Sequence, residues 1–460
     1  MRIGPLRPGI LCLVGMIPAG LGCSTSRTAT STTQSHHRSV EPIATRADPP
    51  NTHVASNSIQ QASFAEPAAK QSTGPLSLED LLALTRSHNP NLAAAAARVG
   101  EAQGRLIQAG LYPNPTVGYS GNQINDGPGT AGQQGGFVAQ EILTGGKRDI
   151  AREAARYGVT VADWAATAQW FETQAKVKTA YYELATAKAV QRETDAAVQM
   201  FSEAIERTKK LADAGKGDAY DVTRLRVEHA GNENRATVAR QRIATAERLL
   251  AVAIGIDRLP ESASAELAVL PDVLRFEDAA VHASQSSPVM AATAEADQAR
   301  ADLRSAEVKP IPNVQTVTTV AHDYVTRAPM VSVLVGLPLP LWDRNQGNIV
   351  SARSRTALMQ SGVEQARLRM QERLTNAYQR YENARRQADR YRMTILPQAT
   401  AALEQIEKIY DLRGERFTDT LDARRTLAQA RIEYTQLQGD VWMAAVEIES
   451  IVQRPQEKSP

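Results

Sequence analysis

The chain has 460 residues, a formal net charge of +2 and an aromatic content of 5%. This near-neutral balance gives no reason to expect a nucleic-acid partner, because such proteins usually carry a basic patch. The only two cysteines, Cys12 and Cys23, lie near the N-terminus, so the body of the chain has neither a disulfide framework nor a cysteine metal site.

The N-terminus has the pattern of a segment for export. Arg2 and Arg7 precede an apolar stretch, GILCLVGMIPAGLG, which predicts a signal peptide over residues 1–22. Cys23 follows at once, and GLGC resembles a bacterial lipoprotein cleavage box, so we expect lipidation there; an ordinary signal peptide is the alternative. Residues 23–75 are rich in Ser, Thr, Ala, Pro and Gln, which predicts a disordered tether.

The rest of the chain consists of two similar repeats. Asn89–Val117 has a counterpart in Ser287–Val314, with a helical Ala-rich run that ends in a Pro-x-Pro pair in both. Two further segments repeat at the same offset of about 200 residues, which indicates a duplication. We therefore expect a first repeat over 76–256, a linker over 257–274, a second repeat over 275–453 and a short tail over 454–460.

Each repeat predicts a helix, two strands, a very long helix, a short turn and a returning helix. The first helix begins after Ser77, where Asp80 completes a capping box. The strands are predicted from β-branched and aromatic residues between turn-rich segments. They cover Val117–Gln123, Gly136–Ile142, Val314–Tyr324 and Met330–Leu337.

The outgoing helices are far longer than those of ordinary globular domains. Val159–Ala214 contains neither Gly nor Pro, so a helix of about 85 Å is predicted, or about 100 Å if it starts at Gly146. The corresponding run Asn348–Arg413 is interrupted by a proline only at Pro397. This length favours a coiled coil or a helical tube. A soluble helical hairpin is the alternative, but it leaves the paired strands unexplained.

No stretch after the N-terminus has the apolar length of a membrane-spanning helix, so we expect any membrane segment to be built from strands. A lipid-facing sheet has to close, and membrane barrels have at least about eight strands, so the four predicted strands imply an oligomer. Aromatic residues are expected at strand ends and loops, as an interfacial girdle or as plain packing. They are Tyr112, Tyr119, Phe137, Tyr324 and Trp342.

The duplicated plan, the Pro-x-Pro entry to the first strand and the Gly-led turns resemble the TolC-type outer-membrane efflux proteins. EILTGGKRDIAREAA (Glu141–Ala155) and GLPLPLWDRNQGNIVSARS (Gly336–Ser354) look like the strand-to-helix junctions of the cobalt-zinc-cadmium branch. The resemblance implies a mainly α fold with a small β part. It also implies a homotrimer with a 12-stranded β-barrel and a periplasmic helical tube. An inner-membrane RND pump and a periplasmic adaptor would feed it, and it would contact outer-membrane lipid.

The junctions between strands and long helices agree with that plan. Pro338 and Pro340 lack the N–H groups that a sheet interior needs, and Gly145 and Gly146 allow the corresponding bend in the first repeat. Nearby cations are expected to meet lipid phosphates or line the pore, and the alternative is that they are solvated charges at a helix start. They are Lys147, Arg148 and Arg344.

The turns between long helices are the candidate gating region. LADAGKGDAYDV lacks the residue order of a phosphate-binding or EF-hand loop, and its counterpart RGERFTDTL keeps only the glycine and the acidic helix start. The resemblance implies adaptor-docking tips at Gly215, Lys216, Gly414 and Arg416. It also implies a constriction of carboxylates at Asp419 and Asp422, with Asp218 and Asp221 in the first repeat. The alternative role of these aspartates is helix capping.

No motif for catalysis, a cofactor or a stable metal site is predicted, because no HExxH or nucleophile–base pattern occurs. His229 and His322 are expected at most to face water in a pore. The sequence therefore predicts a passive outer-membrane channel subunit of a tripartite pump, with divalent heavy-metal cations as the expected substrate. Drug efflux and type I secretion are alternatives within this class, and a periplasmic adaptor or structural coiled coil is the alternative outside it.

Overall fold

Two sets of elements follow one another in the same order along the chain. The computed structural model describes residues 76–124, 132–260, 263–267, 269–413 and 416–453. The signal peptide, the tether with Cys23, Gly414 and the tail beyond Gln453 lie outside the described residues. The first set is α1 (Leu78–His88), α2 (Pro90–Ala109), β1 (Thr116–Asn122), β2 (Gln133–Ile142), α3 (Lys147–Asp213) and α4 (Ala219–Ile254).

The second set has one additional break in its long helix. It is α5 (Phe276–Ser284), α6 (Ser287–Val308), β3 (Val314–Asp323), β4 (Ala328–Gly336), α7 (Gln346–Arg390), the π-helical turn η1 (Tyr391–Ile395), α8 (Leu396–Arg413) and α9 (Phe417–Val452). The prediction of a mainly helical fold with four strands is confirmed, including the Ser77–Asp80 capping box that opens α1.

The four strands form one antiparallel sheet in the order β1-β2-β3-β4. All four predicted strands are present, and their bounds differ from the prediction by three residues or fewer. The placement of Phe137 and Tyr119 at strand ends was wrong. β2 begins earlier and pairs Phe137 with Gly118 and Thr319, and Tyr119 lies in the middle of β1, opposite Gly136. A Cβ atom on Gly118 would lie 2.6 Å from the Phe137 ring, so glycine makes room for that ring.

Helix α3 is unbroken over 67 residues, which corresponds to about 100 Å. It begins immediately after Gly146, whose φ of 67° is in the left-handed region that glycine tolerates. The predicted long helix is thus confirmed, with its start at the earlier of the two positions considered.

The matching run in the second repeat is divided by η1, close to the predicted interruption at Pro397. Proline cannot donate a backbone hydrogen bond, and its ring crowds the carbonyl four residues earlier. A π-helical turn widens the backbone at this place and lets the helix continue without a sharp break.

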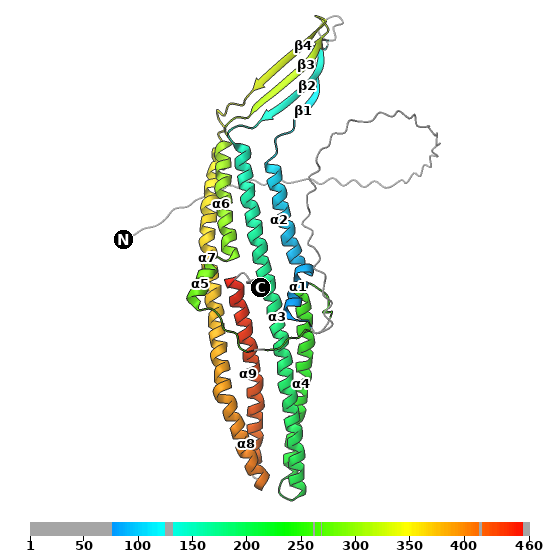
Figure 1. Ribbon diagram of the computed structural model, residues 1–460, viewed down its shortest axis with the longest axis vertical. Helices are drawn as coiled ribbons and strands as arrows, with labels where there is room; N and C mark the ends of the chain where they lie inside the picture. Colours follow the sequence, from blue (N-terminus) through cyan, green and yellow to red (C-terminus); the bar gives the residue numbers. More distant parts are fainter. Residues whose placement is uncertain (1–75, 125–131, 261–262, 268, 414–415, 454–460) are drawn as a thin grey trace, which may run out of the picture. The chain divides into compact units, whose positions relative to one another are not determined.

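The helical bundle has two levels along its length, one nearer the sheet and one farther from it, and α3 belongs to both (Figure 1). Nearer the sheet, α2 contacts α3, α3 contacts α6 and α6 contacts α7. We call these four helices the upper row. Farther from the sheet, α3 contacts α4 and α9, and α9 contacts α8. The upper row follows the strand order, since each of its helices connects directly to one strand.

Two apolar clusters hold the middle of the bundle. One centres on Leu184 and Leu250 between α1, α3 and α4, and the other on Leu374 and Ile448 between α5, α7 and α9. Both combine several Ala residues with larger Leu, Ile, Val and Tyr side chains, so small and large residues interdigitate between the long helices. In the described part of the chain, no helix is both long and apolar enough to cross a membrane.

Candidate functional site: the hairpin tips

The first tip joins α3 to α4. Gly215 has a φ of 74°, and the N–H of Lys216 donates to the carbonyl of Leu211 at 2.9 Å, which closes the end of α3. Asp218 is the N-cap of α4, and its carboxylate accepts from the N–H of Tyr220 at 2.9 Å. The capping role considered for Asp218 is therefore present in the structure.

Asp221 lies in the first turn of α4 and is half-buried. Burial raises the pKa of its carboxyl, the nearby Asp218 raises it further, and Arg224 opposes both. The carboxylates of the first tip are thus close enough to interact with one another.

The second tip joins α8 to α9, and its aspartates are paired with arginines. Arg416 is the N-cap residue of α9, with a φ of 66°, and its Nε donates to the Asp419 carboxylate at 2.6 Å. Asp422 lies 3.4 Å from Arg425. In one chain, both predicted constriction carboxylates therefore have a cationic partner within their own helix.

The two tips pack against each other through an apolar cluster that links α3, α4, α8 and α9. Its centre is Phe201, Leu225, Tyr410 and Leu421, with Phe417 at the start of α9. The Tyr410 hydroxyl donates to the Thr208 hydroxyl at 3.1 Å. Burial raises the pKa of Tyr410, so this hydrogen-bonded phenol stays neutral at physiological pH.

Polar contacts surround that cluster. Arg224 donates to Thr418 at 3.2 Å and lies over the ring of Phe417, while Arg425 pairs with Glu228. Within the second hairpin, the almost fully buried Arg424 makes two hydrogen bonds to one Glu407 oxygen, at 2.7 and 2.9 Å. Each tip is thus anchored to the other by side chains that come from both repeats.

Four residues that hold the two tips together were not predicted from the sequence: Tyr410, Phe417, Arg424 and Glu407. Glu407 lies on α8 and Arg424 on α9, the two helices of one hairpin, so no fixed sequence spacing reveals their contact. The available signal was the turn itself, because residues at equal distance from a hairpin tip face each other.

The junction from β2 to α3 contacts the second repeat. A Cβ atom on Gly145 would lie 2.8 Å from Ile311, and Lys147 donates to the carbonyl of Ile311 and, at 2.7 Å, to the side chain of Asn313. Thr144 donates to the carbonyl of Pro312 at 2.5 Å. Lys147 therefore holds the Pro-x-Pro segment of the other repeat.

The junction from β4 to α7 is tied to the end of α6. β4 ends at Gly336, before Pro338 and Pro340, and the exposed Trp342 follows. Asn345 takes a left-handed φ of 60° and donates to the carbonyl of Ala306 at 2.8 Å, which ties the start of α7 to α6. The backbone N–H of Arg344 donates to the side chain of Gln346 at 2.8 Å, a contact that does not involve the guanidinium group.

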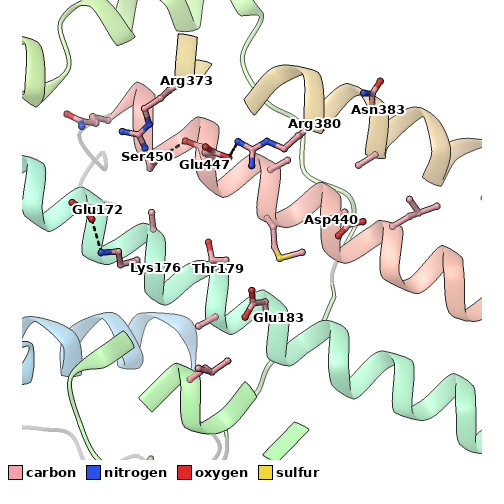
Figure 2. A pocket seen from close by; sticks show the side chains of 18 of the residues that line it. Glu172, Lys176, Thr179, Glu183, Arg373, Arg380, Asn383, Asp440, Glu447 and Ser450 are labelled. Atoms are coloured by element: carbon pink, nitrogen blue, oxygen red, sulfur yellow. Dashed lines mark hydrogen bonds and ion pairs between the residues drawn. The ribbon is translucent and has the colours of Figure 1, made fainter. Parts of the chain in front are cut away.

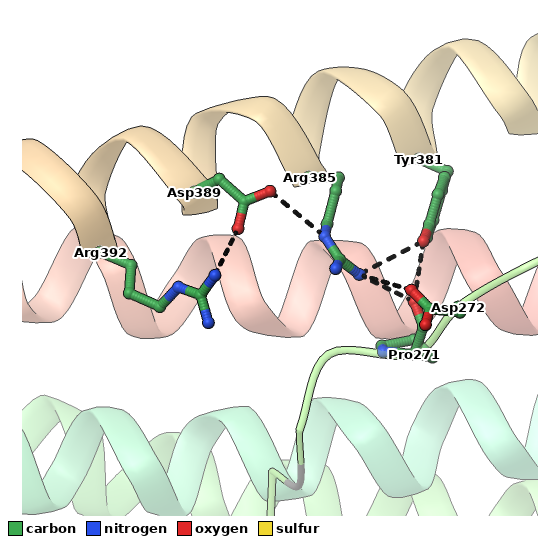
Figure 3. Close-up of polar contacts among 6 residues, drawn as sticks. All are labelled: Pro271, Asp272, Tyr381, Arg385, Asp389 and Arg392. Carbon is green, nitrogen blue, oxygen red and sulfur yellow. Dashed lines mark hydrogen bonds and ion pairs between the residues drawn. The ribbon is translucent and has the colours of Figure 1, made fainter.

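The linker between the repeats is held on α7 (Figure 3). Arg385 donates to the carbonyl of Pro271 at 3.0 Å and lies 3.5 Å from Asp272, and the Tyr381 hydroxyl donates to the same carbonyl at 2.8 Å. Arg385 also contacts Asp389, one turn farther along α7. The linker is thus fixed just before the π-helical turn.

A broad groove of about 1160 Å³ is bordered mainly by α3, α7 and α9 (Figure 2). Glu172 pairs with Lys176 at 2.7 Å, and Glu447 pairs with Arg380. Asp440 also faces the groove, and partial desolvation there raises the pKa of its carboxyl. The groove therefore carries charged side chains of both signs along a lining that is otherwise mainly apolar.

Histidines do not gather into a metal centre in the described residues. His229 lies 3.6 Å from Glu233 on α4, and the ring of His322 meets the ring of Tyr324 edge to face. Across the described ranges, no group of three or more His, Cys, Asp or Glu side chains is placed to hold a metal ion.

The family profile described as outer membrane efflux protein matches residues 81–256 and 282–452. The chain belongs to this family. The predicted resemblance and the predicted outer-membrane localisation are both confirmed. The two matched stretches carry the two sets of elements, so this outer membrane efflux protein has the family's features in both repeats.

Similar proteins extend along most of the chain. The cobalt-zinc-cadmium resistance protein CzcC of Cupriavidus metallidurans is 27% identical over 387 residues, covering 84% of this chain and 92% of its own. The VceC outer membrane protein of Vibrio cholerae has a TM-score of 0.66 at 18% identity, covering 82% of this chain and 95% of VceC. The open-state MtrE outer membrane channel of Neisseria gonorrhoeae has a TM-score of 0.67 at 17% identity, covering 82% and 88%. The two solved structures, VceC and MtrE, share the fold of this chain.

Proposed function

We propose that this efflux protein is the outer-membrane channel subunit of a tripartite pump and exports divalent heavy-metal cations. The observation that carries the proposal is the single four-stranded sheet at one end of the bundle of long helices (Figure 1). A sheet in lipid has to close, and its edge strands β1 and β4 each have one side that no other strand of the described residues pairs with.

Three copies close the sheet into a barrel. Each chain contributes four strands, so a homotrimer supplies twelve, within the range of known membrane barrels. The long helices then continue from the barrel as a periplasmic tube. The chain itself is a passive duct, so an inner-membrane RND pump supplies the energy. A periplasmic adaptor connects the pump to the channel.

The tips form the periplasmic entrance. Gly215, Lys216, Gly414 and Arg416 contact the adaptor, and Asp419 and Asp422, with Asp218 and Asp221, converge from three copies around the axis. A ring of carboxylates favours cations over anions. Because Arg416 and Arg425 pair with the second-repeat carboxylates, the ring reaches its full negative charge only when those arginines turn away.

The heavy-metal substrate is supported by the similarity to CzcC, whose name assigns it to cobalt, zinc and cadmium resistance. Of the cations at the strand–helix junctions, Arg148 and Arg344 are suited to the phosphate groups of outer-membrane lipid, whereas Lys147 already donates to Ile311 and Asn313. Lipidation at Cys23 would add a second attachment to the membrane.

Metal and drug tolerance of a deletion strain tests the substrate. We expect greater sensitivity to zinc, cobalt and cadmium, restored by the wild-type gene, with drug tolerance unchanged. Unchanged metal tolerance together with new drug sensitivity would replace the metal substrate with drugs and leave the channel assignment in place. Loss of a secreted protein alone would indicate type I secretion.

A further inference from the structure

Two side chains on α4, His229 and Glu233, have the spacing of two metal ligands. The residues are four positions apart in a helix, so their side chains lie on the same face. The Nδ1 atom of His229 lies 3.6 Å from the Glu233 Oε2 atom. This is longer than a good hydrogen bond, whose N···O distance is about 2.7–3.2 Å. Two ligands that each lie about 2.1 Å from one tetrahedral ion are about 3.4 Å apart, so the observed separation suits an ion between them.

Neither side chain is committed elsewhere in the described part of the chain. The His229 ring makes no hydrogen bond there, and 24% of its side chain is exposed. Among the same residues, no lysine or arginine lies within 4 Å of the Glu233 carboxylate. By contrast, the Nδ1 atom of His88 contacts the Ser87 hydroxyl and the Leu84 carbonyl. The imidazole of His229 and the carboxylate of Glu233 are therefore both available to a third partner.

The pair lines a polar groove of about 480 Å³ between α3 and α4. Across the groove, α3 contributes the side chains of Gln199 and Ser202, whose oxygens can complete a coordination shell directly or through water. The other charged residues of the groove, Asp195 and Arg240, pair with each other at 3.3 Å. Glu233 is thus the carboxylate of this groove without a cationic partner among the described residues, and the charge of the groove favours a cation.

We propose that His229 and Glu233 bind a divalent transition-metal ion, with Zn²⁺ as the representative of the class. An imidazole nitrogen and a carboxylate oxygen together suit ions such as Zn²⁺, Co²⁺ and Ni²⁺, whereas Mg²⁺ and Ca²⁺ prefer oxygen ligands alone. Two protein ligands leave the other positions to water or to the side chains of α3, so the ion exchanges with solvent. The site goes beyond the proposed function, since a passive duct needs no metal site of its own.

The bound ion links two successive turns of α4, about three turns from the start of the helix at Ala219. Because the folded helix brings both ligands together, metal binding should stabilise the folded protein as the metal concentration rises. The site is separate from the proposed constriction, whose first-repeat carboxylates, Asp218 and Asp221, lie at the start of the same helix.

Isothermal titration of the full-length protein with Zn²⁺ tests the site, in detergent and with a purification tag that contains no histidine. We expect His229→Ala and Glu233→Ala each to weaken the binding of one Zn²⁺ ion per chain by at least about tenfold. His88→Ala is the matched control, since His88 is a helical histidine whose ring contacts a hydroxyl and a carbonyl, and it should bind zinc as wild type does. Equal zinc binding by wild type and His229→Ala, or a wild type that binds no zinc, would overturn the site and leave an ordinary ion pair.

A gain of affinity gives a second measurement. Glu233→His places a second imidazole at the same helical spacing, so zinc should bind about tenfold more tightly and raise the melting temperature more than in wild type. The melting temperature of His229→Ala should not rise with zinc. A folded Glu233→His variant with the zinc affinity of wild type would contradict the pairing of these two positions around an ion. The metal and drug tolerance of the deletion strain tests the proposed function separately, so failure of this site leaves the channel assignment in place.

Discussion

Gly439 on α9 lies directly against Thr186 on α3. A Cβ atom on Gly439 would be 2.2 Å from the Thr186 Oγ1 atom and 2.8 Å from its Cγ2 atom. Real Cβ atoms do not approach other heavy atoms so closely. Helices α3 and α9 therefore cross at a point where the residue on α9 must lack a side chain.

We predict that Gly439→Ala destabilises the protein by about 1–3 kcal/mol, since overpacking forces backbone shifts. Thr186→Ala removes the two atoms that clash, so the double variant Gly439→Ala/Thr186→Ala should recover most of the loss. Denaturant unfolding of the purified protein in detergent measures both effects. A double variant that is no more stable than Gly439→Ala would show that Thr186 is not the obstacle.

Arg424 joins α9 to α8 through Glu407, with only 4% of its side chain exposed. Arg424→Leu leaves the Glu407 carboxylate without its main partner in a partly buried place, so we expect a loss of about 2 kcal/mol. Arg392→Leu is the control, because Arg392 and Asp389 form an exposed pair for which a loss below about 1 kcal/mol is expected. Equal unfolding free energies for the two variants would contradict a structural role of the Arg424 contact.

The elements themselves were predictable from the sequence because their signals are local. A helix start was indicated by Ser77 with Asp80, and most of α3 by a long run without Gly or Pro. The strands were indicated by their position between Pro-x-Pro segments and turn residues. The duplication then fixed their order. Pro397 also marked the place where the long helix of the second repeat departs from regular geometry, although the π-helical form of the turn depends on how the backbone around it adjusts.

The joint between the tips was not predictable in the same way. Tyr410 meets Thr208, and Arg425 meets Glu228, across about 200 positions of sequence, so their contact depends on the register between two hairpins. The pairing of Asp419 with Arg416 was closer to reach, at three residues on one helix, but it depends on the left-handed backbone of Arg416. Phe137 was misplaced because its strand begins among glycines and glutamines, which carry little β signal.

Arg416 provides a test of the constriction. In the proposed trimer, Arg416→Ala removes the cation that lies 2.6 Å from the Asp419 carboxylate, so the preference for cations over anions should increase. Asp419→Asn with Asp422→Asn should decrease it. The shift in reversal potential under a salt gradient across a planar bilayer measures both. Arg392→Ala, distant from the tips, should leave the potential unchanged. A constriction elsewhere is indicated if neither tip variant moves it.

Asp440 on α9 predicts a dependence of stability on pH. Asp440 is exposed overall, but partial desolvation by the surrounding helices raises the pKa of its carboxyl above the ordinary value of 3.8, so the folded state holds this proton more tightly than the unfolded state. The stabilising effect of that proton is complete below pH 3.8 and is lost as pH rises through the raised pKa. Asp440→Asn should therefore increase thermal stability at neutral pH, and the difference from wild type should vanish in acid. Glu447→Gln, which takes a partner from Arg380, should give no such gain. The melting temperature measured in detergent between pH 3 and pH 8 compares them, and a constant difference at every pH would exclude the titration of Asp440 as its cause.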